Sequence, residues 1–208
     1  MCNFAGQPLG LLIGFQGSQK RSDDLPKDDY DYAEWWNLTK PSEEELEEQK
    51  KKKFDYMPKF SIVIPVYKTP EKFLKEMLDS IVEQTYANWE LCIADGSPAG
   101  ESVENVLKKY AEKDARIRYQ VLGENRGISG NTNAALEMAE GDFIVLADHD
   151  DRLTPNALFE CAKKLNENEN CDVLYSDEDK LDMDGDELFD PHFKPDFNPD
   201  LLTSVNYI

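Results

Sequence analysis

A short apolar segment of this chain leads directly into four side chains that could do chemistry. Residues 143–147, F-I-V-L-A, have the composition of a buried strand, and Asp148, His149, Asp150 and Asp151 follow them. Carboxylates crowded together repel one another unless a cation lies between them. Mg2+ and Mn2+ prefer oxygen ligands and can carry substrate phosphates on their remaining positions. The pattern therefore predicts a metal site for a phosphorylated substrate. His149 is expected to be structural, because a hard cation prefers oxygen.

The alternative is a solvated acidic loop, since the chain has 43 Asp and Glu against 23 Lys and Arg. The resulting net charge of −20 argues against nucleic acid or an anionic membrane surface as the main partner, because both would be repelled. The same charge would repel a diphosphate substrate. This is a second reason to expect a metal at the acidic cluster.

Strands and helices alternate between residues 60 and 176, which predicts right-handed βαβ units and a parallel sheet flanked by helices. A strand as apolar as residues 143–147 is expected to be covered on both faces. Thr69 is expected to cap the first helix, with Pro70 at its first position. The expected strands are residues 60–66, 89–94, 117–122, 143–147 and 171–175, and the helix before the acidic strand is expected at residues 129–140.

Polar side chains follow four of the expected strands. They are Tyr67, Asp95, Asp148 with Asp150, and Asp177. The carboxyl ends of parallel strands share one edge of a sheet, where ligands bind, so we expect these side chains to converge.

Neither of the two glycine-rich phosphate motifs, G-x-G-x-x-G and G-x-x-x-x-G-K-[ST], occurs in the chain. A phosphate would then be held by the metal and by scattered donors such as Arg126.

Residues 1–58 show weak periodicity and are expected to form an N-terminal extension to a domain at residues 59–208. Tyr30, Tyr32, Trp35 and Trp36 form an aromatic cluster that is expected to dock on the domain or on a missing part. A capping box at Ser42 should open a polar spacer helix. The tail, residues 182–208, is expected to be ordered loop.

Four cysteines, at positions 2, 92, 161 and 171, form no C-x-x-C pair, and we interpret them as small hydrophobic residues in a reducing compartment. The apolar segment at residues 8–15 is too short to cross a bilayer. We therefore expect a cytoplasmic protein, which could associate peripherally with the inner face of the membrane through regions absent from this chain.

Several motifs resemble the family 2 glycosyltransferases with the GT-A fold, in particular bacterial enzymes of cell-surface polysaccharide synthesis such as rhamnosyltransferases. They are S-I-V-I-P-V-Y at 61–67, W-E-L-C-I-A-D-G-S at 89–97, N-R-G-I-S-G-N-T-N-A-A-L at 125–136 and L-A-D-H-D-D at 146–151. Y-S-D-E-D-K at 175–180 and F-D-P-H-F-K-P-D-F-N-P-D at 189–200 are typical of that branch. The resemblance covers about residues 59–208 and implies a mostly parallel α/β sheet.

The resemblance also implies a role for each matching residue. Asp148 and Asp150 would form the D-x-D pair, with Asp150 the direct ligand of Mg2+ or Mn2+ and Asp148 nearer the ribose. The donor would be a UDP- or dTDP-sugar, and the acceptor a saccharide or lipid-linked saccharide. Pro65 and Tyr67 would line the base pocket, Asp95 would bind the base, and Arg126, Gly127 and Asn131 would face the ribose and diphosphate.

The chain departs from the family pattern in two places. Many relatives have a second aspartate where this chain has Gly96. An inverting transferase also needs a general base, and in the family that residue lies beyond the position of Ile208. We therefore expect a fragment that binds the donor with little or no transfer. Asp177, Asp179 and Lys194 are acceptor-side candidates.

Two alternative functions are considered. A sugar nucleotidyltransferase would need a glycine-rich loop after the first strand, and the sequence P-V-Y-K-T-P does not provide one. A truncated nucleotide-sugar-binding module would bind without turnover, or would expose an apolar face where the missing part packs.

Overall fold

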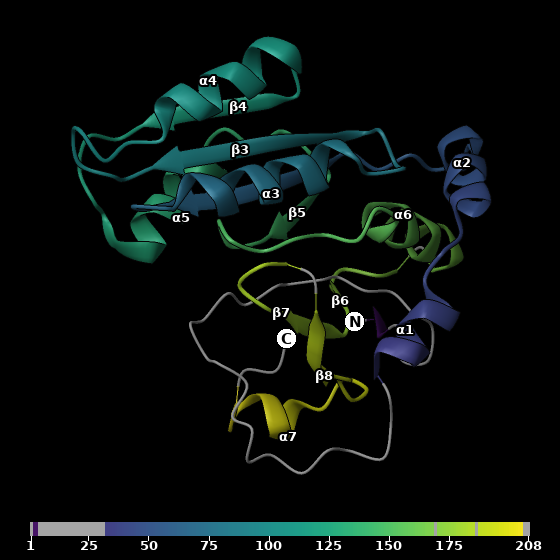
Figure 1. The fold of residues 1–208 in the computed structure, drawn as a ribbon. Coiled ribbons are helices and arrows are strands. Elements are labelled where there is room, and N and C mark those ends of the chain that lie inside the picture. Colours follow the sequence, from purple (N-terminus) through teal and green to yellow (C-terminus); the bar gives the residue numbers. More distant parts are fainter. Residues whose placement is uncertain (1, 4–31, 169, 186, 206–208) are drawn as a thin grey trace.

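The computed structural model describes residues 2–3, 32–168, 170–185 and 187–205. In this part of the chain a parallel sheet with its helices precedes a smaller C-terminal group of elements (Figure 1). The elements are β1 (Cys2–Asn3), α1 (Tyr32–Thr39), α2 (Glu43–Lys51), β2 (Phe60–Val66), α3 (Glu71–Val82), β3 (Trp89–Asp95), α4 (Glu104–Lys113), β4 (Ile117–Val121), α5 (Gly127–Leu136), β5 (Phe143–Leu146), α6 (Ala157–Glu167), β6 (Leu174–Tyr175), β7 (Glu178–Leu181), β8 (Leu188–His192) and α7 (Pro199–Leu202).

The central sheet has four parallel strands in the order β4-β3-β2-β5. Its register pairs Val66 with Asp95 and Val63 with Leu146, so the ends of β2, β3 and β5 reach the same edge. The α/β class and the parallel sheet predicted from the sequence are confirmed.

Different helices cover the two faces of the sheet. The larger core joins alternate residues of β2 and β3 to α3, α4 and α6, and includes Leu78, Leu107 and Leu158. The smaller core on the other face consists of Val63, Ala94, Ala134 and Ala135, the last two from α5. The small alanines allow α5 to lie close to β2 and β3, which fixes the height of this helix above the sheet.

The prediction that the strand at residues 143–147 is covered on both faces is wrong. β5 is an edge strand, and Ile144 and Leu146 are 43% and 65% exposed. Their neighbours in β2 are Ser61 and Val63, on the face that carries α5. Because α5 packs over β2 and β3, it leaves the same face of β5 uncovered among the described residues.

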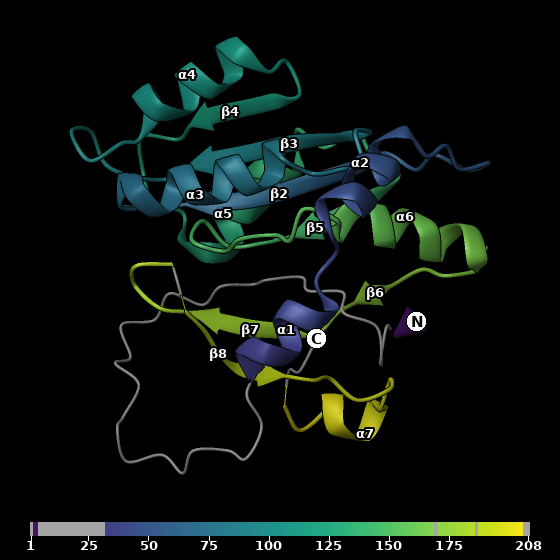
Figure 2. The ribbon, with the colours of Figure 1, turned by 45° about the vertical axis from the view of Figure 1, so that its right-hand side comes forward.

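The prediction of a strand at residues 171–175 and of a loop after residue 182 is also wrong. Only Leu174–Tyr175 is extended, and it pairs in parallel with β1 rather than joining the central sheet. The tail contains β8, which forms an antiparallel pair with β7, and the short helix α7. Figure 2 shows this hairpin, with α1 and α7, as a separate group beside the sheet.

Side chains of the sheet domain hold the hairpin turn. Arg152 donates to the carbonyl of Gly185 over 2.9 Å, and Lys72 donates to that of Met183 over 2.8 Å. Both turn carbonyls are therefore tied to the sheet domain.

The aromatic cluster of the N-terminal segment docks on the hairpin. Tyr32 stacks on Trp35, and both rings meet Phe193 edge-on. The Tyr32 hydroxyl donates to Asp179 over 2.5 Å. Tyr30 lies outside the described residues. The capping box of α2 is formed as predicted, with Ser42 and Glu45 as partners, and the domain boundary at residue 58 stays a prediction.

Several helix boundaries differ from the predictions. The N-cap of α3 is Pro70, and the Thr69 hydroxyl is buried without a hydrogen-bond partner, so the predicted Thr69 cap is wrong. α5 begins at Gly127 and ends at Leu136, which is earlier at both ends than predicted. Helices in the described ranges are all too short or too polar to cross a membrane.

Candidate functional site

The carboxyl edge of the central sheet brings together the ends of β2 and β3. The backbone amide of Gly96 donates to the carbonyl of Val66 over 2.9 Å, and the amide of Lys68 donates to the Ser97 hydroxyl over 2.8 Å. Tyr67 lies between these contacts and is 39% exposed, and Pro65 is half-buried. The two residues predicted to line a base pocket thus lie at this edge, and that role stays a prediction.

Asp95 holds the loop that follows β3. Its side chain is fully buried, and one carboxylate oxygen accepts from the Ser97 amide over 2.8 Å. The other oxygen accepts from the Ser102 hydroxyl over 2.7 Å and from the Val103 amide over 3.2 Å. Asp95 therefore shapes the turn into α4, and its predicted contact with a base would be a second role.

Asn131 connects α5 to the same edge. Its buried side-chain oxygen accepts from the Arg126 amide over 3.1 Å, and its amide nitrogen donates to Asn125 over 3.1 Å. A Cβ atom at Gly96 would lie 2.5 Å from the Asn131 side chain. Glycine at this position therefore allows Asn131 to pack against the turn after β3, and a second aspartate here would require the Asn131 side chain to move.

Asp151 closes the acidic turn after β5. Its carboxylate accepts from the Asp148 amide over 2.8 Å, and its own amide donates to the Asp148 carbonyl over 3.2 Å. Asp148 and Asp150 are half-buried, and their carboxylates accept no hydrogen bond from the described part of the chain. The turn thus leaves the two predicted ligands available while Asp151 fixes the backbone between them.

Asp151 belongs to the acidic cluster predicted from the sequence, but no separate role was predicted for it. Burial raises its pKa to about 7, and the charges of Asp148, Asp150 and Glu178 act in the same direction. One of its oxygens is buried without a hydrogen-bond partner. Its three-residue spacing from Asp148 is the signal that could have indicated a side chain closing this turn.

His149 lies inside the turn. Its Nδ1 atom is buried without a hydrogen bond and lies 3.5 Å from Oδ1 of Asp150. The predicted structural role of His149 stays a prediction.

Asp177 was predicted to converge with the other site residues because it follows a fifth strand of the central sheet. This premise is wrong, since β6 is not in that sheet. Asp177 accepts from the backbone amide of Lys194 over 2.7 Å. The buried Lys194 ammonium lies 3.0 Å from Glu178. These acceptor-side candidates therefore form a network of their own on the hairpin.

Asp179 lies under α1 and is buried. Burial raises its pKa to about 6, with the charge of Glu178 raising it further and the hydrogen bond from Tyr32 lowering it. Its second oxygen has no hydrogen-bond partner.

The side chains of the acidic turn fit one part of a divalent metal site. Carboxylate oxygens are suitable ligands for Mg2+ or Mn2+. The described ranges contain no group of three or more His, Cys, Asp or Glu side chains that could hold a metal ion. Asp148 and Asp150 could thus supply part of a coordination sphere, and phosphate oxygens of a substrate would have to complete it.

Arg126 and Gly127 stand where α5 begins. The Arg126 side chain is exposed and lies 3.2 Å from Glu124, and the Gly127 amide donates to Asn125 over 2.9 Å. The predicted donor residues are thus distributed over the ends of β2, β3 and β5 and the start of α5.

Comparison with known proteins gives a family match over most of the chain. The model of the family described as "Glycosyl transferase family 2" matches residues 61–201. An uncharacterised protein of Sinorhizobium fredii is 42% identical over 151 residues, which is 73% of this chain and 16% of that protein. An O-antigen biosynthesis protein of Myxococcus xanthus is 33% identical over 178 residues, covering 86% of this chain and 14% of that protein.

This chain therefore spans less than a fifth of the length of either relative. Among solved structures, S. aureus TarS 1–349 in complex with UDP aligns with a TM-score of 0.49 and 29% identity, over 53% of this chain and 33% of that one.

Proposed function

The chain belongs to glycosyl transferase family 2, and we propose that it binds a nucleotide-diphosphate sugar at the carboxyl edge of its sheet for metal-dependent, inverting transfer to a saccharide acceptor. Its parallel α/β domain has the GT-A organisation that the sequence motifs imply. The proposed donor is a UDP- or dTDP-sugar.

One observation carries this proposal. β2 lies between β3 and β5, so the turn with Asp95 and the turn with Asp148 and Asp150 lie on either side of its end. Asn131 ties the start of α5 to the first of these turns. The residues proposed to contact the base, the diphosphate and the metal would therefore surround the carboxyl end of β2.

The proposed chemistry assigns a task to each group. Asp150 would bind Mg2+ or Mn2+, and Asp148 would face the ribose or share the metal. When bound, the metal would neutralise charge on the diphosphate leaving group. The acceptor oxygen would form a bond to the anomeric carbon as the bond from that carbon to the phosphate oxygen breaks. The acceptor proton would pass to a general base.

Relatives support the biological setting of the proposal. One is named an O-antigen biosynthesis protein, and others are named chondroitin and hyaluronan synthases. We propose that the chain acts in cell-surface polysaccharide synthesis, at the cytoplasmic face of the membrane.

Donor binding without turnover is the second candidate function. The two acceptor-side carboxylates already have partners, since Asp177 accepts from Lys194 and Asp179 accepts from Tyr32. This favours a general base outside the described residues.

Titration calorimetry of the chain with UDP and with dTDP, each with and without Mn2+, tests the proposal. We expect Mn2+-dependent binding of one nucleotide, and we expect Asp150→Asn to weaken it at least about tenfold, as expected for a metal ligand or its support. Asp172→Asn is the matched control, because it removes an exposed carboxylate outside the site. Equal binding by Asp150→Asn and Asp172→Asn, or no binding by the parent, would refute the site.

A transfer assay with the same donors separates the two candidate functions. Release of the nucleotide diphosphate in the presence of saccharide acceptors supports the transferase. Binding without release supports the binding module.

A further inference from the structure

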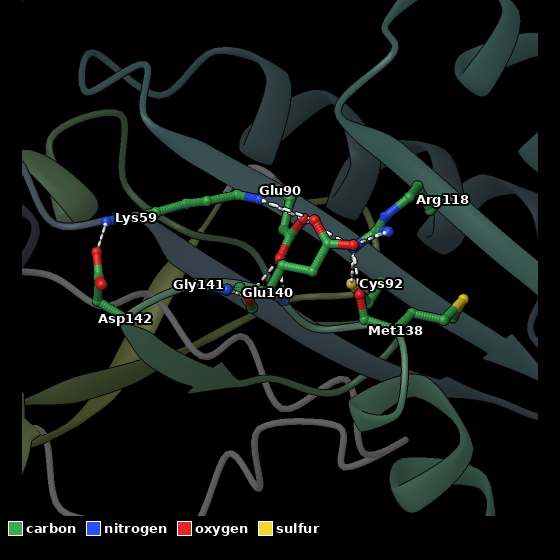
Figure 3. A network of polar contacts seen from close by, with 9 residues as sticks. Lys59, Glu90, Cys92, Arg118, Met138, Glu140, Gly141 and Asp142 are labelled. Atoms are coloured by element: carbon green, nitrogen blue, oxygen red, sulfur yellow. Dashed lines mark hydrogen bonds and ion pairs between the residues drawn. The ribbon is translucent and has the colours of Figure 1, made fainter.

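A charged network lies at the edge of the sheet opposite the proposed donor site. Its centre is Glu90, the second residue of β3, which is 4% exposed (Figure 3). One carboxylate oxygen accepts from the Ser61 hydroxyl over 2.6 Å and from the Glu140 amide over 2.5 Å. The other accepts from Lys59 over 2.7 Å and from Arg118 over 2.8 Å. Glu90 thus receives four hydrogen bonds, from β2 and the residue before it, from β4, and from the connector that follows α5.

The connector between α5 and β5, residues 137–142, is held at several points by this network. Besides the Glu140 amide, the Gly141 amide donates to Ser61 over 2.8 Å, and the Met138 carbonyl accepts from Arg118. Asp142 accepts from the backbone amide of Lys59 over 2.8 Å. The path of the connector is therefore set by side chains from three strands.

The fit at Gly141 shows how little freedom the connector has. A Cβ atom at Gly141 would lie 2.6 Å from the Lys59 carbonyl oxygen and 2.6 Å from the Ser61 hydroxyl. Because one of these neighbours is backbone, it cannot move away as a flexible side chain could.

Both elements joined by the connector carry residues of the proposed donor site at their far ends. α5 extends from the connector back to Gly127, ten residues or about 15 Å of helix. β5 extends from the connector toward the turn at Asp148, four residues or about 13 Å of strand. A shift of the connector would therefore change the position of the start of α5 relative to the acidic turn.

We propose that Glu90 is a positioning residue for the donor site, which holds the connector so that the start of α5 and the turn at residues 148–151 stand at the spacing that a metal-bound diphosphate requires. This inference rests on the proposed function. Glu90 itself would touch neither the donor nor the metal, since it lies at the opposite edge of the sheet.

Glu90→Gln tests this proposal, because it keeps the shape of the side chain and removes its charge. The matched control is Leu107→Ala, which removes a fully buried side chain from α4 on the face away from α5. Ser61→Ala is a milder second variant that leaves the ion pairs intact, in case Glu90→Gln does not fold. Nucleotide binding with Mn2+ is measured by calorimetry, and amide exchange is measured by mass spectrometry.

We expect Glu90→Gln to raise the Kd for the nucleotide by roughly 3- to 30-fold, the range that remote coupling residues reach. Ser61→Ala should act in the same direction by a smaller factor. Amide exchange should accelerate at residues 125–131 and 147–151 in these variants. Leu107→Ala should leave both measurements in these segments close to those of the parent.

A folded Glu90→Gln protein with the Kd and exchange of the parent, or with the pattern of Leu107→Ala, would overturn the proposal. If the parent binds no nucleotide, the proposed function fails by that result alone. The exchange measurement then still decides whether Glu90 couples the two segments, because it needs no ligand.

Discussion

The pKa values of buried carboxylates shift in opposite directions at the two edges of the central sheet, the amino edge where the strands begin and the carboxyl edge where they end. At the amino edge, Glu90 accepts four hydrogen bonds and lies beside Lys59 and Arg118. Burial alone would raise its pKa, but these donors and the charge of Arg118 lower it to about 2. At the carboxyl edge, Asp151 accepts one hydrogen bond and has three acidic neighbours, and its pKa rises to about 7.

This difference separates an edge with paired charges from the edge at which we propose that the donor binds. Lys59 and Arg118 approach Glu90, whereas no Lys or Arg is paired with the carboxylates of the acidic turn in the described residues, and the nearby basic group is Nδ1 of His149, 3.5 Å from Asp150. Buried charges cost free energy unless they are paired. Paired charges therefore stabilise the sheet domain at one edge. At the other edge the carboxylates carry charge that a cation would stabilise.

The largest effect should come from removing the charge at the centre of the amino edge. Glu90→Ala leaves four hydrogen-bond donors without their shared buried acceptor and should cost about 3 kcal/mol of unfolding free energy, the lower end of the range for a broken buried ion pair, because Lys59 and Arg118 are partly exposed and keep Glu140. Asp148→Ala should change it by less than about 1 kcal/mol, because its carboxylate is not paired. Urea denaturation at pH 7 measures both. Similar losses for the two variants would contradict the division between the edges.

Two close-packed glycines give a second, smaller contrast. Gly141→Ala should destabilise by about 3 kcal/mol, because its new methyl group meets the Lys59 backbone. Gly96→Ala should cost about 1 kcal/mol, because the Asn131 side chain that it meets can rotate away. The second variant should lose more nucleotide affinity, since Asn131 supports the start of α5. Thermal melting and calorimetry on both proteins check this, and the reverse order in stability would be inconsistent with it.

The third effect is the dependence of stability on pH. Asp179 has a folded pKa of about 6, above its ordinary value, so its burial costs nothing below about pH 4 and becomes fully unfavourable above pH 6. Stability should therefore fall as pH rises from 4 to 6. Asp179→Asn should remove the part of this fall that Asp179 causes and gain about 2 kcal/mol at pH 7, with allowance for solvent screening. The part caused by Asp151, whose pKa is raised to about 7, should remain.

Glu90 should change stability with pH in the opposite direction to Asp179, because its folded pKa is lowered. Its contribution is present above the unfolded value of 4.5 and is lost as pH falls toward 2. Denaturation between pH 3 and 8 measures both trends. A flat profile for the parent between pH 4 and 6 would argue against the Asp179 assignment.

The sequence predicted the parallel sheet well, because β2 and β3 are long, mostly apolar segments and amphipathic helices separate β2, β3 and β4. It failed at β5, where the apolar residues Ile144 and Leu146 face outward at an edge strand. The residue types show that a strand is apolar, but they do not show which helices or strands cover its faces in the folded protein. β8 was missed because Asp190 and Pro191 are residues typical of a loop.

The candidate site was predicted residue by residue at the strand ends, and the structure places Tyr67, Asp95, Asp148 and Asp150 at one edge. Asp177 was misplaced because β6 was assumed to join the central sheet. The packing of Asn131 against Gly96 could not be predicted, since it depends on the distance between two elements rather than on a local pattern.

The network around Glu90 also has a consequence for how the protein folds. Its hydrogen bonds join residues 28, 31 and 50 positions apart in the sequence, on β2, β3, β4 and the connector. Contacts of such separation require loops to close before they contribute. The strand pairs of β2, β3 and β4 have separations of 26 and 29 positions, so the contact of Glu90 with Glu140, at 50 positions, should form after these strands are assembled. Substitutions at this contact should then accelerate unfolding more than they slow folding. Glu90 should therefore lower the unfolding rate of the assembled sheet and lengthen the lifetime of the native state.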